Sequence, residues 1–322
     1  MRLAVISDLN SQYGSTTYET EVLRTVEYLP QWEPDLVLCS GDMVAGQFPS
    51  LTRAEIEAMW AAFDRNIAQA IRKAKLPYGF TIGNHDASGA LGLGGKELFA
   101  QERELARAYW NTHADTGVNF VDQAGFPYFY TFAQKFAQGQ DEVFFLVWDA
   151  STSRIPPEQL DWAEKALASD RAQGAKLRIV TGHLPLYAVA VGREYLGEIV
   201  ENGDRVRQML EKYRVHTYIS GHHHAYYPAH KGTLQLLHSG ALGSGARPLL
   251  DSRLPVTKTL TLIDISLAKA DTVYTTYNMT TQEVIDMKTL PRQIVGPNGY
   301  VLRRDINESD LTPAEKSAEF SG

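Results

Sequence analysis

The chain has 322 residues, of which 44% are hydrophobic, and this composition supports a folded core and excludes a disordered protein. Its 31 basic and 38 acidic residues give a net charge of −7, without any run of five or more like charges. We therefore expect no duplex nucleic acid as a partner. Cys39 is the single cysteine, so no disulfide can form within the chain, and cysteine usage says nothing about the compartment.

The longest apolar runs, such as VFFLVW at 143–148, are far shorter than the roughly 18 residues that a membrane-spanning helix needs. We expect a soluble protein with no membrane span. Met1 stands directly before the first apolar segment, without the two regions of a secretory signal. The sequence is compatible with two locations: the cytoplasm, or export with a signal peptide already removed.

Strand-like segments at 2–7, 35–39 and 78–83 alternate with helical patterns near 17–29 and 52–75. This alternation predicts an α/β fold with layers of helices and strands.

Residues 87–141 interrupt the alternation and are predicted to form an insertion. The insertion holds a glycine-rich loop, a charged helix near 96–112 and the aromatic run FPYFYTF. The layered core is expected to resume with a strand at 142–149, a helix near 157–173 and a strand at 176–183.

A helix near 204–213 is followed by four strand-like segments with no helix between them, at 215–220, 234–240, 257–266 and 271–278. Such late strands predict a second sheet that packs on the first. From about residue 291 the sequence becomes polar and loses its periodicity. We therefore expect a catalytic domain at 1–290 and a C-terminal extension at 291–322 that wraps around it or is partly disordered.

Five of the predicted strands end in polar groups that bind metals in other proteins. These groups are Asp8 and Asn10, Asp42 of SGDM, Asn84, His85 and Asp86 of GNHD, His183 of TGHLP, and His222, His223 and His224 of SGHHHA. Each motif alone has a simpler explanation, because an acid after a strand often caps a helix and three histidines can form a surface cluster. Together they predict one crevice at the strand ends, lined by oxygen and imidazole ligands.

The order D-x-N, GD, GNHD, GH and GHxH resembles the calcineurin-like metallophosphoesterases over roughly residues 2–240. The resemblance implies a four-layer α/β/β/α sandwich of two mixed sheets with two metal ions at the strand ends. By position, it implies that the first metal is bound by Asp8, Asp42 and His224. The second metal would be bound by Asp42, Asn84, His183 and His222, so Asp42 would bridge the two ions.

The first motif of that family is normally D-x-H, and here Asn10 occupies the position of the histidine. Amide oxygen suits Mn²⁺ or Mg²⁺, whereas imidazole suits zinc and iron. We expect two divalent ions, with manganese favoured and iron, zinc or magnesium as alternatives. In a second interpretation Asn10 is no ligand and only caps the turn NSQYGS by bonding to its own backbone.

The charges of such a site favour an anionic substrate. Two divalent ions bring four positive charges, and two aspartates with a bridging hydroxide would leave about +1, which attracts a phosphate ester. The resemblance implies that this hydroxide is the nucleophile.

Four further residues have expected roles in catalysis or substrate binding. His85 would contact the phosphate and protonate the leaving group, and Asp86 would either orient it or serve as a turn or cap acid. Arg193, in the loop at 187–198, is expected to bind the substrate phosphate unless it is a solvated loop residue. His223 is assigned to the substrate or to packing, since its side chain should alternate away from its neighbours.

The sequence thus predicts a metal-dependent hydrolase of phosphate monoesters or diesters that acts on a small phosphorylated substrate. The alternative is a metal-bound scaffold or partner-binding module of the same fold without catalysis, and only Asn10 supports it. The sequence does not indicate the oligomeric state.

Overall fold

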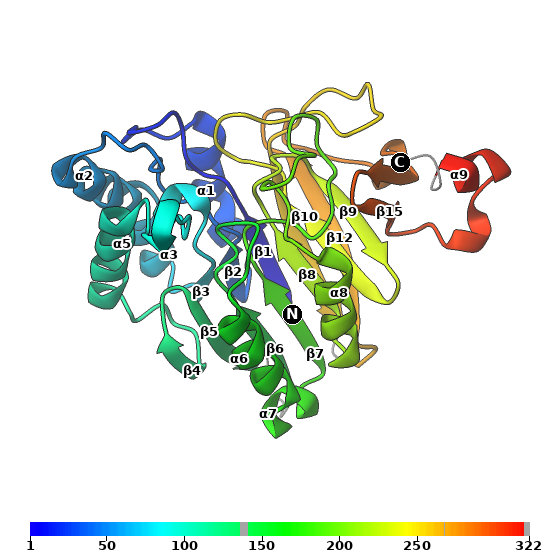
Figure 1. The fold of residues 1–322 in the computed structure, drawn as a ribbon, viewed down its shortest axis with the longest axis horizontal. Helices are drawn as coiled ribbons and strands as arrows, with labels where there is room; N and C mark the ends of the chain where they lie inside the picture. The colour runs from blue at the N-terminus through cyan, green and yellow to red at the C-terminus, as the bar shows by residue number, and fades with distance from the viewer. Residues whose placement is uncertain (136–140, 267, 319–322) are drawn as a thin grey trace.

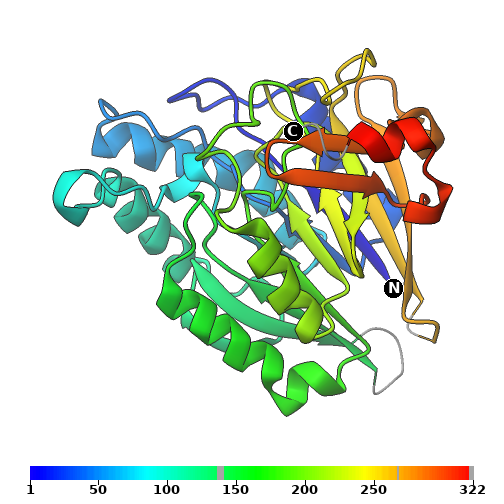
Figure 2. The ribbon, with the colours of Figure 1, turned by 45° about the vertical axis from the view of Figure 1, so that its right-hand side comes forward.

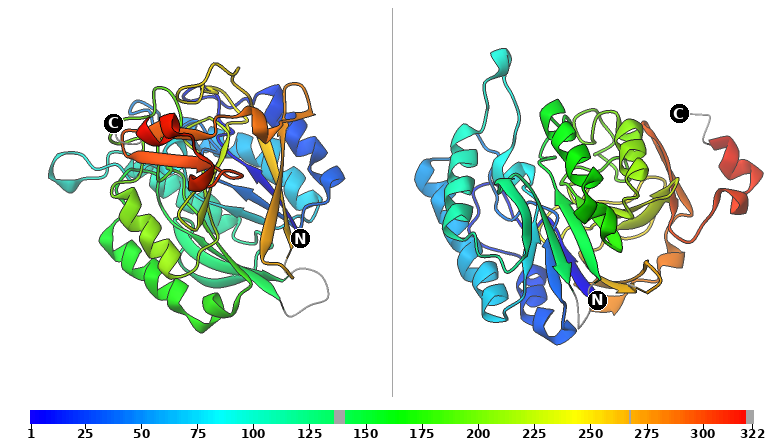
Figure 3. Two further views of the ribbon diagram at one scale, coloured as in Figure 1. Left: turned by 90° about the vertical axis from the view of Figure 1, so that its right-hand side faces the viewer. Right: turned by 90° about the horizontal axis from the view of Figure 1, so that it is seen from below.

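A computed structural model describes residues 1–135, 141–266 and 268–318 of the chain. In these residues two mixed β-sheets pack face to face, and helices cover the outer side of each sheet (Figure 1 and Figure 3). The chain therefore has the expected α/β architecture of four layers.

The two sheets contain six and nine strands within the described residues. The order in the six-stranded sheet is β13 (Glu283–Val284), β12 (Asp271–Asn278), β11 (Thr259–Ser266), β1 (Arg2–Ile6), β2 (Leu36–Cys39) and β3 (Tyr78–Phe80). The order in the nine-stranded sheet is β14 (Gln293–Gly296), β15 (Gly299–Arg303), β9 (Tyr227–Lys231), β10 (Leu234–His238), β8 (Thr217–Ser220), β7 (Leu177–Thr181), β6 (Glu142–Val147), β5 (Phe129–Lys135) and β4 (Phe120–Gly125).

All helices of the described residues except the last one lie between strands along the chain. They are α1 (Thr20–Trp32), α2 (Arg53–Phe63), α3 (Gln69–Lys73), α4 (Asn84–Ala87), α5 (Ala100–Thr112), α6 (Pro157–Ala168), α7 (Asp170–Gly174), α8 (Gly203–Lys212) and α9 (Pro313–Ala318). None of the helices in the described residues has the length and apolar composition that crossing a membrane requires.

The first strand shows how the sequence builds the layers. In β1 the side chains of Leu3 and Val5 belong to the core between the sheets, whereas Ala4 and Ile6 belong to the core beneath the helices. Successive side chains of a strand point to opposite faces, and a sheet covered on both faces needs apolar residues at every position. The continuous apolar run of β1 is therefore the expected pattern for an inner layer.

The predicted helices occur, with two changes in their regularity. The long helix near 52–75 contains a π-helical turn at Asp64–Ala68 between α2 and α3. The helix near 157–173 is divided into α6 and α7 at Ser169, whose side chain accepts a hydrogen bond from the backbone N–H of Ala172. Ser169 thus caps a new helix start within an otherwise helical pattern.

The prediction that all the late strands form the second sheet is wrong. Strands β11 and β12 return to the first sheet, where β11 pairs antiparallel with β1. This pairing covers the free edge of β1, which would otherwise expose backbone hydrogen-bonding groups. The second sheet is instead built mainly from the middle of the chain, β4 to β10.

Two segments expected to lie outside the core contribute strands to the larger sheet. The second half of the expected insertion forms β4 and β5, and β5 pairs antiparallel with β6. In the expected C-terminal extension, β14 and β15 form a hairpin (Figure 2). Leu302 of β15 pairs with His230 of β9. Residues 319–322 of that extension lie outside the described residues.

Candidate metal centre and active site

Five loops of the two sheets meet at one edge of the sandwich. Strands β1, β2 and β3 run parallel in one sheet, and β7 and β8 run parallel in the other, so the carboxyl ends within each set share an edge. Asp8, Asp42 and Asn84 follow the first three strands, and His183 and His222 follow the other two. The structure therefore brings together the residues that the sequence predicted as ligands.

The two aspartates form the buried centre of this group. Asp8 and Asp42 are completely buried and, with His183, place one potential ligand atom each within 4.8 Å of one another. The Nε2 atom of His183 lies 3.3 Å from Oδ2 of Asp42, and Nε2 of His224 lies 3.1 Å from Oδ1 of Asp8. Such an arrangement of carboxylate oxygens and imidazole nitrogens fits divalent cations.

The side chains of His183 and His222 both approach the amide of Asn84. Its Oδ1 atom lies 2.8 Å from Nε2 of His183 and 2.9 Å from Nδ1 of His222. The amide Nδ2 donates to Oε1 of Gln47 at 2.6 Å, and this hydrogen bond directs Oδ1 toward the imidazoles. Ligands bound to one cation at about 2.1 Å each lie about 3 Å from one another, so these separations suit a shared ion.

Hydrogen bonds at the far side of each ring determine which nitrogen offers a lone pair. Nδ1 of His183 lies 2.8 Å from the Ser40 carbonyl oxygen, and Nδ1 of His224 lies 3.0 Å from the Gly245 carbonyl oxygen. In His222 the outer nitrogen is Nε2, 2.8 Å from a carboxylate oxygen of Glu198. Carbonyl and carboxylate oxygens only accept, so the neutral rings keep their protons there and present lone pairs to the centre.

Two buried oxygens of the site accept no hydrogen bond from the described residues. They are Oδ2 of Asp42 and Oδ1 of Asn10. A buried polar atom without a partner is costly unless it has a ligand. A divalent cation would satisfy Oδ2 of Asp42, so the residues fit a metal centre on this ground as well. The side-chain oxygen of Asn10 does not cap the local turn, and the second interpretation of this residue loses its basis.

Backbone strain is concentrated at these residues. Asp8, Asp42, His222 and His224 have φ angles of 50°, 57°, 63° and 53°, in the left-handed region that residues other than glycine rarely adopt. Strain of this kind persists only where the surrounding structure imposes it, and it occurs preferentially at functional sites.

Glycine is required at two positions beside the ligands because neighbouring atoms lie where a Cβ atom would be. A Cβ atom on Gly41, whose φ is 102°, would lie 2.5 Å from Nδ1 of His183. A Cβ atom on Gly221 would lie 2.2 Å from Oγ of Ser7. Both distances are shorter than real contacts allow, so any other residue would push the ligand loops apart.

The protonation equilibria reflect competition between protons and a cation. Burial alone would raise the pKa of Asp42, but His183 and His85 outweigh it and hold that pKa below its usual value. Burial likewise opposes protonation of His183, yet Asp42 and Asp8 raise its pKa to about 9. A metal ion between the same carboxylates competes with this proton for the imidazole lone pair. Burial lowers the pKa of His222 to about 4, which favours the neutral form that binds metals.

His85 lies beside this centre without joining it. Its Nδ1 is 2.9 Å from the Gly46 carbonyl oxygen, and its Nε2 is 4.0 Å from Oδ2 of Asp42. The ring packs against Tyr13, with the ring centroids 5.1 Å apart. Nε2 therefore faces the carboxylates at the margin of the site.

Asp86 does not orient His85, and the expected catalytic role is corrected. Its carboxylate accepts hydrogen bonds from the backbone N–H groups of Gly83, Asp42, Met43 and Val44 at 2.6–2.9 Å. Burial and the charge of Asp42 raise the pKa of this carboxyl to about 7. Asp86 is thus the turn acid of the alternative interpretation, and it holds the Asp42 loop in its strained shape.

The expected substrate contact of His223 is also corrected. Its side chain is fully buried, with Nδ1 accepting from the Val189 N–H at 3.3 Å and Nε2 lying 3.1 Å from the Glu198 carbonyl oxygen. A ring that is occupied in this way on both nitrogens has a packing role.

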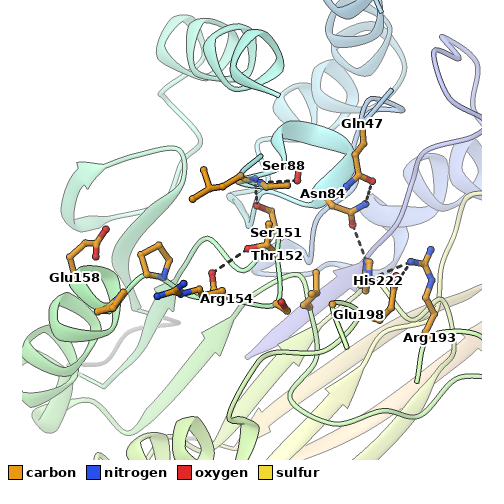
Figure 4. Close-up of a pocket in the computed structure, with 18 residues that line it drawn as sticks. Gln47, Asn84, Ser88, Ser151, Thr152, Arg154, Glu158, Arg193, Glu198 and His222 are labelled. Atoms are coloured by element: carbon orange, nitrogen blue, oxygen red, sulfur yellow. Dashed lines mark hydrogen bonds and ion pairs between the residues drawn. The ribbon is translucent and has the colours of Figure 1, made fainter. Parts of the chain in front are cut away.

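Arg193 lies at the margin of the site, beside His222. Its guanidinium pairs with the Glu198 carboxylate and lies 3.4 Å from Nε2 of His222. Figure 4 shows Arg193, Glu198 and His222 together at one end of a cavity of about 680 Å³. Asn84 and Gln47 line the same cavity, so a ligand in it would contact the candidate metal centre directly.

Sequence reasoning missed two residues of this site. Gln47 directs the amide of Asn84, and Glu198 binds both His222 and Arg193. Neither residue follows a strand or belongs to a motif. For Glu198 the only signal was its place in the 187–198 loop, which was expected to contact the substrate.

Comparisons with known proteins give the family and the fold. The model of the calcineurin-like phosphoesterase family matches residues 1–226. A purple acid phosphatase from yellow lupin (Lupinus luteus) seeds is similar with a TM-score of 0.61 and 18% identity, over 88% of this chain and 52% of that chain. The present chain thus covers about half of the lupin enzyme.

Two other solved structures are similar over most of their length. A dimetal phosphatase from Danio rerio has a TM-score of 0.54 and 13% identity, over 81% of this chain and 91% of that chain. The GAP50 anchor of the inner membrane complex of Plasmodium has a TM-score of 0.55 and 12% identity, over 99% of this chain and 93% of that chain. At such identities these likenesses concern the fold alone. No curated protein matched the sequence. By the match of the family model over residues 1–226, the chain belongs to the calcineurin-like phosphoesterase family.

Proposed function

We propose that this protein is a dinuclear metal-dependent hydrolase of phosphate esters. The observation that carries the proposal is the meeting of the side-chain atoms of Asn84, His183 and His222 beside Oδ2 of Asp42, a buried oxygen that accepts no hydrogen bond from the described residues. A cation would replace the proton that His183 otherwise holds between these atoms. The same geometry at Asp8 and His224 supports a second ion.

The residues divide into two ligand sets that share Asp42. One set is Asp8, Asp42 and His224, with the amide oxygen of Asn10 as a fourth group, and the other is Asp42, Asn84, His183 and His222. When bound, the two ions would supply Lewis acidity and a bridging hydroxide as nucleophile. With only two carboxylates among the ligands, the site keeps a net positive charge that favours binding of a phosphate ester.

Other side chains would position the substrate and the leaving group. Arg193 lies beside His222, where its guanidinium can hold phosphate oxygens. His85 would donate a proton to the leaving oxygen, and because its Nδ1 proton bonds to the Gly46 carbonyl, this requires a second proton on Nε2.

The ligand types support manganese as the physiological metal. Carboxylate and amide oxygens of Asp8, Asp42 and Asn10 suit Mn²⁺ or Mg²⁺, while the imidazoles also suit iron and zinc. A small phosphorylated molecule is the proposed partner, and both monoesters and diesters fit the chemistry.

The alternative is a metal-bound scaffold of the same fold. One solved protein of this fold is described as an anchor, so the fold by itself does not imply hydrolysis. The placement of His85 near Asp42 and of Arg193 beside His222 favours catalysis, since a scaffold would need neither.

A direct test uses p-nitrophenyl phosphate and bis(p-nitrophenyl) phosphate with metal-free protein, before and after addition of Mn²⁺. We expect hydrolysis of at least one ester only after addition, and two metal ions per chain by mass spectrometry. Asp42→Asn should bind less metal and lose the activity. Two bound ions without hydrolysis of either ester would favour the scaffold.

A further inference from the structure

The mouth of the candidate active site has an unusual concentration of exposed apolar side chains. Six of the fourteen large hydrophobic side chains that the described residues expose lie on two loops that contribute residues to the active-site cavity: Leu91, Leu93, Leu98, Val191, Tyr195 and Leu196. We call these six residues the apolar rim. Leu93 and Leu196 are almost completely exposed. Scattered apolar residues need no explanation, but a group beside a ligand cavity marks a binding surface.

Both loops of the apolar rim contribute residues to the cavity that reaches the metal ligands. Leu91 lines the same 680 Å³ cavity as Asn84 and His222, and so does Gly197, the neighbour of Leu196. Leu184, Pro156 and Pro157 also line it. A ligand with its phosphate at Asn84 and His222 would therefore extend along apolar walls toward the apolar rim.

Most polar groups of the cavity are already engaged with the protein. The hydroxyl of Ser151 donates to Asp149 at 2.6 Å and accepts from the Gly89 N–H at 3.0 Å. The hydroxyl of Thr152 donates to the Arg154 carbonyl at 3.2 Å (Figure 4). The protons of these hydroxyls are therefore not available to donate to a polar leaving group such as a sugar, which needs matched hydrogen bonds.

One loop of the rim is shaped as a projecting finger (Figure 3). The Leu98 N–H donates to the Ala90 carbonyl at 2.9 Å, and the Gly92 N–H donates to the Lys96 carbonyl at 2.8 Å. These bonds close a short hairpin with Leu93 near its tip. A leucine held there cannot join the core, so its apolar surface is available to a ligand.

We propose that the natural substrate is an amphiphilic phosphate ester whose aliphatic chain lies against the apolar rim. This inference rests on the proposed function and names its substrate class. The rim is mostly aliphatic, and its loops carry Glu97, Glu194 and Glu198 as well as Lys96 and Arg193, so they form no cationic surface for a polyanion. Hydrolysis would break the phosphorus–oxygen bond to the alkyl oxygen, with water supplying the oxygen that remains on phosphate and the proton that leaves with the alcohol.

The test uses the full chain loaded with Mn²⁺ and a series of ethyl, butyl and octyl phosphates below their micellar concentrations. These esters have similar leaving groups and differ in apolar length. Each methylene that becomes buried should lower KM by up to about fourfold, and we expect octyl phosphate to have a KM at least about tenfold below that of ethyl phosphate. Equal KM values across the series would overturn the proposal.

Variants test whether the residues of the apolar rim cause the preference for longer alkyl chains. Leu91→Ser and Leu196→Ser should each reduce the preference for octyl over ethyl phosphate, measured as the ratio of kcat/KM. Val273→Ser, at an exposed valine of β12, is the matched control and should keep the full preference. A preference that survives Leu91→Ser combined with Leu196→Ser would also overturn the proposal.

Calorimetric binding separates this inference from the proposed function. If no ester is hydrolysed, the proposed function fails, but tighter binding of octyl than ethyl phosphate that depends on Leu91 and Leu196 still supports the apolar rim. Sedimentation with phosphatidylcholine vesicles containing phosphatidic acid distinguishes the source of the ester. Binding that is lost in Leu93→Ser indicates a bilayer lipid, and absence of binding with the chain-length preference intact indicates a free amphiphile.

Discussion

The Nε2 atom of His222 lies 2.8 Å from Oε2 of Glu198, and this carboxylate also pairs with the guanidinium of Arg193. The hydrogen bond from His222 and then the one from Arg193 lower the pKa of Glu198 to about 2, so the carboxylate stays ionised at neutral pH. One acid thus fixes the tautomer of a candidate metal ligand and holds the arginine beside it. If Arg193 holds the substrate phosphate, as we propose, Glu198 links metal binding to phosphate binding.

We predict that Glu198→Ala weakens Mn²⁺ binding by about 10- to 100-fold, because His222 loses the partner that orients its ring. Calorimetric titration of metal-free protein measures the effect without reference to activity. Arg193→Ala should instead raise KM with little change in metal affinity.

The control for Glu198 is Glu201→Gln, at an exposed acid nearby that accepts a hydrogen bond from the Ser153 hydroxyl. This variant should bind metal as the wild type does. If Glu198→Ala also retained the wild-type affinity, the carboxylate would have no part in ordering His222.

Asn10 gives a second prediction, because its buried Oδ1 has no hydrogen-bond partner. If the amide is a metal ligand, Asn10→Leu should weaken binding of Mn²⁺, and Asn10→His should tighten binding of the first ion. If it is not, Asn10→Leu removes an unsatisfied buried group and should stabilise the metal-free protein. Metal titration and thermal unfolding of both variants separate these cases, and unchanged titration midpoints would reject the ligand role.

The ligands were predictable from the sequence because their pattern is local. Asp8, Asp42 and His183 each follow an apolar strand, and the parallel strands of a sheet bring their ends to one edge. The tautomers of His183 and His224 were not predictable, because the carbonyls that fix them, at Ser40 and Gly245, come from distant segments.

Roles that depend on tertiary contacts could not be predicted from the sequence for the same reason. The motif GNHD does not reveal that Asp86 binds the backbone of the Asp42 loop, 42–44 residues away. Strand periodicity likewise does not specify a partner, so nothing local showed that β11 pairs with β1 and not with the second sheet. Gln47 and Glu198 lie in loops without periodicity.

The third prediction concerns Glu102, whose carboxylate accepts from the backbone N–H of Gln47, the residue that directs Asn84. Burial raises the pKa of Glu102 from 4.5 to about 7, so the folded protein binds this proton more tightly than the unfolded chain. The contribution of Glu102 to the free energy of unfolding therefore falls as pH rises from about 4.5 to about 7, by about 1–3 kcal/mol.

Glu102→Gln should remove this contribution. Chemical unfolding of metal-free wild type and variant at several pH values measures the difference, in which the other titrating groups cancel. We expect the variant to gain stability relative to the wild type as pH rises through that interval. A difference that does not change with pH would mean that Glu102 titrates normally in the folded protein.

The last prediction concerns His85, which faces the carboxylate of Asp42 from 4.0 Å while its Nδ1 is held by the Gly46 carbonyl. If it protonates the leaving oxygen, His85→Ala should slow hydrolysis of an alkyl phosphate by about 10²- to 10⁴-fold and that of p-nitrophenyl phosphate much less, because p-nitrophenolate leaves without a proton. Metal content measured by mass spectrometry should not change, since His85 belongs to neither ligand set. Equal losses for both esters would assign His85 to phosphate binding alone.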